Sequence, residues 1–556
     1  MTLVPNLTRA SLTLCLMLAL AGCQTLPDAP PADYETLASE AAAGGSVSVT
    51  DLRSAFLQSD DFNARMQALA PLEQQAMQLM EDEPLRLGAI GTAIVDEYFA
   101  SITGHKALQQ YYDHVGAADA ADEHAAWLSQ IIAAVETDAD GSVRAPYSVI
   151  SAGEAQAYLR LRNRIPVGSM YYSTEHTPFM VLIAAQAPQG RMQSYYFNLT
   201  GAYQAIQAAV GRSHEGESFD PGTLIDYLAQ QEDSAAQASI GSYLYAQQRF
   251  EEAAHWFRAS SRSGNVLANL MLAHIYQMQA LRSSGDDQDE ALELALDNYT
   301  TAIAMGSDDA MFALGTLYLE GYYGDDNIES GVSLLQQAAD LSHTDSLLWL
   351  GHLHREGLHV NQSIDSARRY FSQAAETGSP RAQRHYTRFL LANANVIAFD
   401  DRVLDWLNVL IAEDDAEAML LKGALQARGL GISQNFRRAQ RWYRRAAESG
   451  EHNAELINEI AWTLTVSHMT RLRQPEFALR IMERTMTSDS SARANAAYLD
   501  TWAAAYAANG NFERALDIQR QALEAAEAED DERLIEVLTK HLELLQQGET
   551  ITDEIP

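Results

Sequence analysis

Apolar residues recur at helical spacing over residues 51–136. Residues three and four positions apart lie on one helix face, so this spacing predicts amphipathic helices. One such set is Leu52, Ala55 and Phe56, and a second is Leu87, Ile90, Ile94 and Tyr98. The segment therefore predicts a helical start to the folded body.

Strand character follows over residues 141–200. The apolar run Pro178–Ala187 and the aromatic-rich run Met192–Leu199 are separated by the turn-like Pro188-Gln189-Gly190. Two such runs around a short turn predict a β-hairpin. The same region holds the β-like Ser148–Ser151 and a predicted helix around Glu154–Leu159.

The boundary between these regions is Asp138-Ala139-Asp140-Gly141. Its aspartates suggest a calcium loop, but Glu136 and Tyr147 occupy the positions where such a loop has Asp and Glu. We therefore interpret the segment as a turn.

A repeat organises the second half of the chain. Alanines recur every 36 residues or at twice that spacing, at Ala302, Ala338, Ala374 and Ala446. Residues 406–412 occupy the unit expected between Ala374 and Ala446. Ala259 precedes Ala302 by one period plus seven residues, and the polar segment 282–289 can hold this insertion as a loop. A period of this length predicts stacked helix pairs.

The units share chemistry as well as length. The first helix carries small residues, as in Ala313-Leu314-Gly315, and the second, best seen at Ala439–Gly450, places Trp442 and Tyr443 between alanines. Small residues let paired helices approach, and aromatic rings fill the space between pairs. Glycines such as Gly378 can end a helix in a left-handed conformation. No pair buries its apolar face alone, so the units must stack.

This pattern resembles the Sel1-like branch of the tetratricopeptide superfamily over residues 233–452. The unit at 415–450 matches best, whereas the unit at 380–414 has Asn393-Ala394-Asn395 in place of the usual Gly-x-Gly turn. The resemblance implies a mainly α fold: an α-solenoid of helix pairs, with a smaller N-terminal helical and α+β region that contains the hairpin.

Residues 453–550 predict further units of the tetratricopeptide type. Trp502–Tyr506 leads to Asn509–Leu516, and Ala461-Trp462 and Phe477–Leu479 suggest a degenerate unit before it. An apolar stripe ends the region, and it predicts either a terminal cap, which we favour, or a partner-binding helix. The stripe consists of Leu534, Ile535, Leu538, Leu542 and Leu545.

The region 49–205 resembles an uncharacterised bacterial domain of unknown function. The resemblance rests on the stretches Asp51–Asn63, Asp140–Leu159 and Tyr196–Thr200. It brings no known activity, and residues 206–232 are interpreted as a connector to the repeats.

The N-terminus has the features of an export signal. Arg9 precedes the apolar run Ala10–Leu20, which is shorter than the ~20 residues that span a bilayer. The following Leu20-Ala21-Gly22-Cys23 resembles the lipobox of bacterial lipoproteins. The resemblance implies a signal peptide at 1–22, cleavage before Cys23 and lipidation of that cysteine. Gln24, by similarity to enterobacterial lipoproteins, favours sorting to the outer membrane.

Removal of the signal would leave little cysteine chemistry. The chain has two cysteines, and Cys15 would leave with the signal peptide. Lipidation of Cys23 then excludes a disulfide within the mature chain and a cysteine-ligated metal site. Residues 23–48 are rich in Pro, Ala, Gly and Ser and predict a flexible tether.

The charge balance is strongly acidic, with a formal net charge of −37. Such a surface repels nucleic acid and anionic lipid headgroups. The charge is explained either by a need for solubility or, more specifically, by binding to a cationic partner.

No catalytic motif stands out, and no cofactor is expected. A cluster of His343, His352, His354 and His359 suggests a metal site, but these positions coincide with repeat scaffold positions. Residues two apart, such as His352 and His354, point from different helix faces. Ser169 and His176 lie near the hairpin, without a nucleophile elbow around Ser169.

One local charge pattern departs from the acidic background. Six cations occur close together at Arg428, Arg437, Arg438, Arg441, Arg444 and Arg445. They form either a solvated helix face balanced by acidic neighbours or a docking patch for an acidic protein or anionic polysaccharide.

These features predict a non-enzymatic scaffold, held by lipid on the periplasmic side of the cell envelope, that binds envelope proteins through its solenoid. One alternative is an outer-membrane scaffold for exopolysaccharide export, by analogy with other lipoproteins of this superfamily. Another is a small-ligand binder or enzyme seated in residues 141–205.

Overall fold

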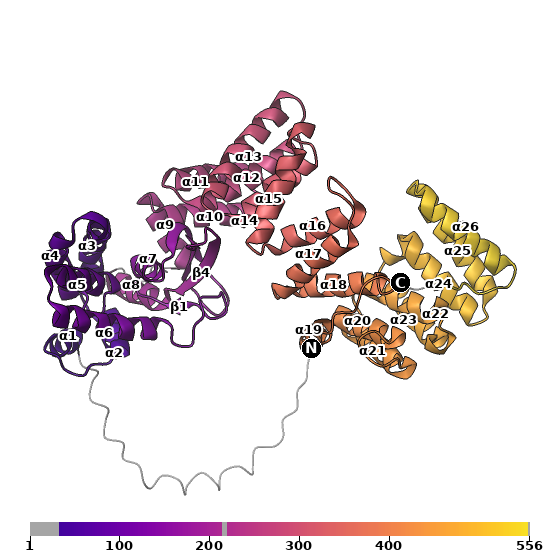
Figure 1. Ribbon diagram of the computed structural model, residues 1–556, viewed down its shortest axis with the longest axis horizontal. Helices are drawn as coiled ribbons and strands as arrows, with labels where there is room; N and C mark the ends of the chain where they lie inside the picture. Colours follow the sequence, from indigo (N-terminus) through magenta and orange to yellow (C-terminus); the bar gives the residue numbers. More distant parts are fainter. Residues whose placement is uncertain (1–32, 214–219, 554–556) are drawn as a thin grey trace, which may run out of the picture. The chain divides into compact units, whose positions relative to one another are not determined.

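The computed structural model describes residues 33–213 and 220–553, which fold mainly as α-helices with one four-stranded sheet in the described part (Figure 1). The predicted mainly α fold is confirmed. The chain divides into two compact units between Ala310 and Met311. The first unit contains the sheet and the first repeat helices, and the second continues the repeats.

The first unit begins with helices over the region where the apolar periodicity predicted them. Leu52, Phe56, Leu87 and Ile94 from that pattern are fully buried. Ser48 and Ser101 cap helices by accepting hydrogen bonds from backbone N–H groups. The elements are α1 Tyr34–Ala42, α2 Val49–Gln58, α3 Phe62–Asp82, the 3₁₀ turn η1 Pro84–Arg86, α4 Leu87–Glu97, α5 Ile102–Val115 and α6 Ala118–Val135.

Helix α1 lies inside the segment that the sequence predicted to be a flexible tether. Asp33 caps the helix, and the Tyr34 ring packs edge-on against Phe56 with centroids 5.1 Å apart. The Tyr34 hydroxyl also accepts a hydrogen bond of 2.8 Å from the Phe99 backbone N–H. This helix could not be predicted from composition, because the segment is mostly small and polar and a single buried aromatic residue anchors it.

The sheet contains the predicted hairpin and two further strands. Its strands are β1 Tyr147–Ser148, β2 Ile165–Tyr172, β3 Met180–Gln186 and β4 Met192–Asn198, in the order β1-β4-β3-β2. Strands β3 and β4 are antiparallel, and β1 runs parallel to β4. The predicted helix near 154–159 is α7, Ala152–Leu161. The sequence missed β2, whose Pro166 and Gly168 are poor strand formers and flank a register shift.

The turn predicted before the sheet is present. Asp138 and Gly141 have φ values of 54° and 79°. A Cβ on Gly141 would lie 2.4 Å from the Tyr147 ring, so glycine is needed there for space as well as conformation. The Asp140 carboxylate accepts a hydrogen bond of 2.8 Å from the Ser142 N–H, as turn aspartates commonly do.

A buried ion pair joins α2 to α7. The Arg53 guanidinium makes two hydrogen bonds, of 2.6 and 3.1 Å, with the Glu154 carboxylate, and a third of 3.0 Å with the Ser148 carbonyl. Glu154 also accepts a hydrogen bond of 2.7 Å from the Ile150 N–H. Burial alone would lower the pKa of Arg53, but Glu154 and Tyr98 raise it above its usual range. The pair connects two of the sequence stretches on which the N-terminal resemblance rests.

The edge strand β2 is completed by side chains from repeat helices rather than by another strand. Ser239 of α10 exchanges hydrogen bonds with the N–H and carbonyl of Tyr171, at 2.7 and 3.2 Å. Asn265, just before α12, does the same with Ser169, at 3.2 and 2.7 Å. A Cβ on Gly168 would lie 2.6 Å from Asn265 Oδ1, so this glycine permits the approach. These side chains cover the outer edge of β2, which would otherwise present unpaired backbone groups.

This contact explains why the first compact unit extends past the predicted domain end at 205 and the connector at 206–232. Leu224 and Ala229, within that connector, are buried in the core of the first unit. The remaining elements of this part are α8 Thr200–Ser213, α9 Pro221–Gln230, α10 Ser234–Ala246, α11 Phe250–Arg262, α12 Val266–Ala280, α13 Asp286–Ala304 and α14 Asp308–Leu319, which crosses the division.

The insertion predicted as a loop at 282–289 is only partly a loop. Helix α13 begins at Asp286 and has three aspartates in its first turn. Their negative charges stabilise the helix by interacting favourably with the positive end of its dipole. The extra residues therefore lengthen the helix, which has 19 residues compared with 13 in α17.

The second unit is a succession of helix pairs, labelled in Figure 1. Its elements after α14 are η2 Asp325–Asn327, α15 Ile328–Asp340, α16 Thr344–Glu356, α17 Ile364–Glu376, α18 Pro380–Ala392, α19 Arg402–Ala412, α20 Ala416–Arg428, α21 Phe436–Ser449, α22 Ala454–Val466, η3 Thr470–Leu472, α23 Pro475–Ser488, η4 Ala492–Ala494, α24 Ala496–Ala508, α25 Phe512–Ala528 and α26 Glu532–Gln546.

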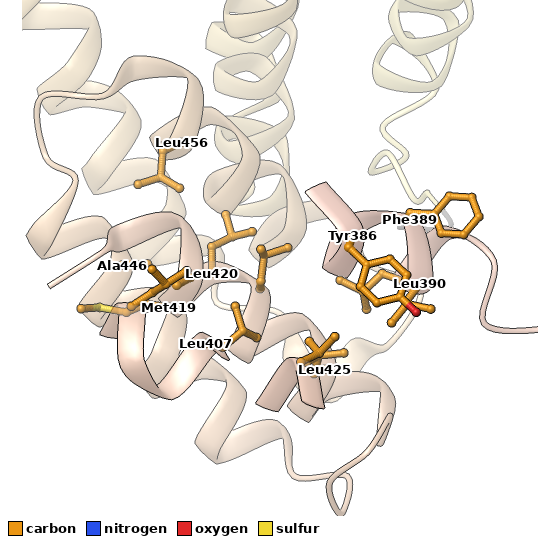
Figure 2. Close-up of a cluster of buried hydrophobic side chains, with 14 of the residues drawn as sticks. Tyr386, Phe389, Leu390, Leu407, Met419, Leu420, Leu425, Ala446 and Leu456 are labelled. Carbon is orange, nitrogen blue, oxygen red and sulfur yellow. The ribbon is translucent and has the colours of Figure 1, made fainter. Parts of the chain in front are cut away.

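One hydrophobic core runs through these pairs from α15 to η4. Figure 2 shows Leu407, Met419, Leu420 and Ala446 meeting within it, together with Leu456 of the next helix. The degenerate unit α18–α19 contributes like the others, since Tyr386 and Leu407 are buried. The repeat therefore continues through the unit whose turn motif is lost.

The C-terminal helices form the additional pairs that the sequence predicted. Ala503, Ala515 and Ala522 are buried between α24 and α25. Helix α26 packs against them, with Leu538 and Leu545 of its apolar stripe buried. This packing is that of a capping helix.

Candidate functional site

The predicted arginine cluster lies on the helix pair α20–α21. Asp415 caps α20 by accepting a hydrogen bond of 2.8 Å from the Ala418 N–H, and Gly429 ends it with φ of 74°. Asn435 caps α21 through a hydrogen bond of 3.0 Å from the Arg438 N–H. The left-handed Gly429 and the Asn435 cap define the turn between the helices.

The packing of this pair decides which way the arginines point. Ala439, Tyr443 and Ala446 of α21 are buried, and a Cβ on Gly423 would lie 3.0 Å from the Tyr443 ring. The small residues let the ring sit against α20. The cationic positions of α21 fall on the opposite face, so they are exposed to solvent.

Between the two helices lies a groove of about 470 Å³. Its wall from α20 consists of Lys422 and Gln426, which are one helical turn apart. Four of the six lining residues carry a positive charge, and no carboxylate lines the groove. The lining residues are Lys422, Gln426, Arg438, Arg441, Trp442 and Arg445.

The cations differ in their partners. Lys422 donates a hydrogen bond of 2.9 Å to the Asn408 side chain, and burial lowers its pKa. The Arg445 guanidinium lies 5.8 Å from the centre of the Trp442 ring and 3.9 Å from the exposed Asp414. In residues 33–213 and 220–553, no carboxylate lies within ion-pair distance of Arg438 or Arg441. Two cations therefore face the groove uncompensated.

The structure divides the predicted cluster. Arg438, Arg441 and Arg445 line the groove, whereas Arg437 is exposed outside it. Arg428 donates a hydrogen bond of 2.7 Å to the Leu391 carbonyl at the end of α18. Arg444 bonds Gln474 at 3.0 Å and lies over the Phe477 ring. These two arginines hold neighbouring units together.

Sequence reasoning missed Lys422 and Gln426. Both lie on α20, outside the arginine-rich segment, and only the pairing of the helices brings them to the groove. Their spacing of four residues on one helix face was the available signal.

Three of the four histidines in the predicted cluster take part in capping or ring packing within the repeats, whereas His359 is exposed. His343 caps α16 by accepting a hydrogen bond of 3.1 Å from the Ser346 N–H, and His354 lies flat on the Tyr370 ring. His352 contacts Phe371 and His385. Burial, and then His352, lowers the pKa of His385 to about 4, so that residue is neutral at physiological pH. Within the described chain, no three His, Cys, Asp or Glu side chains converge as metal ligands would.

The other candidate positions also have structural roles or lie outside the described residues. The Ser169 backbone pairs with Asn265 in the covered edge of the sheet. Cys23 precedes residue 33, so its predicted lipidation lies outside the described part. None of the helices in residues 33–213 and 220–553 combines the length and apolar character of a membrane span.

Comparison with known proteins agrees with the helix-pair geometry. The profile of the Sel1 repeat matches residues 234–265, 308–343, 344–379 and 416–451. The chain contains Sel1 repeats. The matched segments coincide with pairs α10–α11, α14–α15, α16–α17 and α20–α21, so the groove lies in a matched Sel1 unit. The pairs between them, α12–α13 and α18–α19, are those with the insertion and the lost turn motif.

One curated relative and two solved structures illustrate what this chain is similar to. A sel1-like repeat-containing protein of Acanthamoeba polyphaga mimivirus is 34% identical over 90 residues, which is 16% of this chain and about 15% of the relative's length. A Sel1 repeat protein from Oxalobacter formigenes is 21% identical, covering 45% of this chain and 98% of that one, with a TM-score of 0.33. A protective antigen of uropathogenic Escherichia coli strains is 14% identical, covering 94% and 99%, with a TM-score of 0.40.

The Sel1 repeat fold is consistent with a protein–protein interaction scaffold. Proteins built from Sel1 and tetratricopeptide repeats are generally non-enzymatic scaffolds, in which stacked helix pairs present an extended surface to a partner. The cationic groove is a specific feature of that surface in this chain.

Proposed function

We propose that this protein is a lipid-anchored scaffold of the bacterial cell envelope whose Sel1 array docks an acidic segment of a partner protein in the α20–α21 groove. The observation that carries the proposal is the concentration of positive charge in the groove of a chain with a net charge of −37. The predicted lipid on Cys23 would hold the array on the periplasmic side of the outer membrane.

The charge arrangement is unfavourable without an anionic partner. Arg438, Arg441 and Arg445 are three and four residues apart on one helix, where like charges destabilise by roughly 0.2–0.5 kcal/mol per pair. A carboxylate between them relieves that repulsion. Arginine also binds carboxylates through two parallel hydrogen bonds, which gives geometric specificity in addition to charge attraction.

The groove also offers contacts that do not depend on charge. The half-buried Trp442 lines the groove and provides an aromatic surface beside Arg445. An acidic segment with an apolar residue can therefore place carboxylates on the arginines and the apolar side chain on the indole. Aromatic residues and arginine are the types that most often dominate binding energy at protein interfaces.

Charge reversal of the groove tests this proposal. The variant Arg438→Glu/Arg441→Glu/Arg445→Glu should weaken binding of a fluorescent oligoglutamate peptide to the full chain by at least about tenfold, since each charge-assisted hydrogen bond contributes ~1.5–3 kcal/mol. Fluorescence anisotropy at two salt concentrations measures the effect. Binding by the native chain should weaken as salt rises.

A matched variant separates the groove from the overall charge. Arg520→Glu/Arg533→Glu/Lys540→Glu makes the same change in net charge on α25 and α26, at exposed positions. It should bind the peptide like the native chain. Equal loss in both variants, or no loss in the groove variant, would reject docking in this groove. Preferential binding of an oligouronate over the peptide would instead support the polysaccharide-export alternative.

The envelope anchor has a separate test. Cys23→Ser should move the protein from the membrane pellet to the soluble fraction, because serine has no thiol to receive the lipid, and fractionation followed by immunoblotting measures this. Cys15→Ser is the control and should leave the protein in the pellet. Membrane association of Cys23→Ser equal to that of Cys15→Ser would contradict the lipid anchor without affecting the groove.

A further inference from the structure

A second cavity lies in the N-terminal part of the first unit. Its volume is about 500 Å³, within the range of small-molecule sites. It lies where α3, α5 and α7 meet the start of β2 and the β3–β4 turn. The main lining residues are Met77 and Met80 from α3, Ile102 and Lys106 from α5, Arg160 from α7, and Ile165 from β2.

The cavity is mostly apolar, and some of its apolar surface faces solvent. Met77 and Met80 are half-buried, and Ile165 is 57% exposed although it is a large branched side chain. Methionine adapts to ligands of different shape because its side chain is unbranched and polarizable. Exposed apolar residues gathered around a cavity are typical of a binding site, whereas isolated ones are common on any surface.

The charged residues of the cavity are all cations. Lys106, Arg160 and Arg164 line it, and no aspartate or glutamate does. In a chain with 75 acidic and 38 basic residues, such a one-sided lining is unexpected for an ordinary surface. Arg164 is held in place by a hydrogen bond of 3.0 Å to the Tyr195 hydroxyl. Among the described residues, Arg160 has no carboxylate within ion-pair distance.

We propose that this cavity binds an amphipathic anion of the long-chain carboxylate class. The alkyl chain lies along Met77, Met80 and Ile165, and the carboxylate bonds Arg160 and its neighbouring cations. Burying a methylene group contributes roughly 0.8 kcal/mol, so the apolar wall supplies affinity. The cations supply the preference for a charged headgroup. The cavity and the α20–α21 groove share no residue, so this inference is independent of the proposed scaffold function.

Fluorescence of dansyl-undecanoate added to the purified full chain tests the inference. The dansyl emission should rise and shift to the blue as the alkyl chain enters the cavity, and dodecanoate should compete. Dodecanol has the same chain without the charge and should compete at least about tenfold less well. Equal competition by dodecanol, or no change in dansyl emission, would overturn the assignment of an anionic ligand.

Substitutions at two exposed positions test the location of the site without disturbing the core. Arg160→Glu should weaken dansyl-undecanoate binding by at least about tenfold, and Ile165→Asp should do the same by placing a charge in the apolar wall. Arg144→Glu is the control, since Arg144 is exposed and does not line the cavity. Native-like binding by both cavity variants, with circular dichroism unchanged, would show that the anion binds elsewhere and would reject the proposal.

Discussion

Replacing Arg53 with methionine should destabilise the first unit by about 3–5 kcal/mol, because it leaves the buried Glu154 carboxylate without its counter-ion. Both side chains are almost completely buried, with 9% and 2% of their surface exposed. The low local dielectric makes an unpaired charge far more costly there than in water. Chemical denaturation of the full chain, followed by hydrogen exchange of peptides from α2 and α7, measures the loss.

Two further variants identify the cause. Arg53→Met/Glu154→Leu removes both charges, so it should recover much of the stability that Arg53→Met loses. Arg86→Met breaks an exposed ion pair with Glu83, which should contribute less than about 1 kcal/mol. If Arg53→Met and Arg86→Met unfold at the same denaturant concentration, the buried pair does not stabilise the unit.

In the second unit, Phe371→Ala should cost about 3–5 kcal/mol, as expected when a fully buried ring is deleted. The ring packs on Gly351 of the preceding helix, where an added Cβ would lie 2.4 Å from it. Gly351→Ala should therefore destabilise the native chain by roughly 1–3 kcal/mol through overpacking. Chemical denaturation monitored in the second unit by hydrogen exchange of α16 and α17 measures both effects.

The double variant makes this prediction sharper. With Phe371→Ala already present, Gly351→Ala no longer meets the ring, and alanine is a better helix former than glycine by up to ~1 kcal/mol. The second substitution should then be neutral or stabilising, which reverses its sign. Equal destabilisation by Gly351→Ala in both backgrounds would show that the ring is not the reason for glycine at this position.

The two sets of variants address different kinds of information in the sequence. The pairing of Gly351 with Phe371 recurs at the same spacing as Gly423 with Tyr443, and at a shorter spacing as Gly241 with Phe257, so it is visible as a repeated pattern. The pairing of Arg53 with Glu154 spans 101 residues and occurs once. Only the first kind of contact can be inferred from periodicity, because a single long-range pair has no spacing to detect.

The arginine cluster shows the same limit at the candidate site. The concentration of six arginines in a short segment was evident from the sequence, but their division between different roles was not. Arg428 and Arg444 serve contacts with neighbouring helices, while Lys422 joins the groove from the paired helix. Each of these outcomes depends on which side chains the helix pairing brings within a few ångströms.

By itself the sequence determined the helical periodicity, the β3–β4 hairpin and the Sel1 repeat, because these depend on residues close together in the chain or repeated at a regular interval. The tertiary structure alone decided that α1 folds onto the first unit, that β2 is an edge strand, and that Ser239 and Asn265 cover it. Those features depend on contacts between distant segments, including hydrogen bonds that span 65 to 96 residues, and such contacts leave no periodic pattern in the sequence.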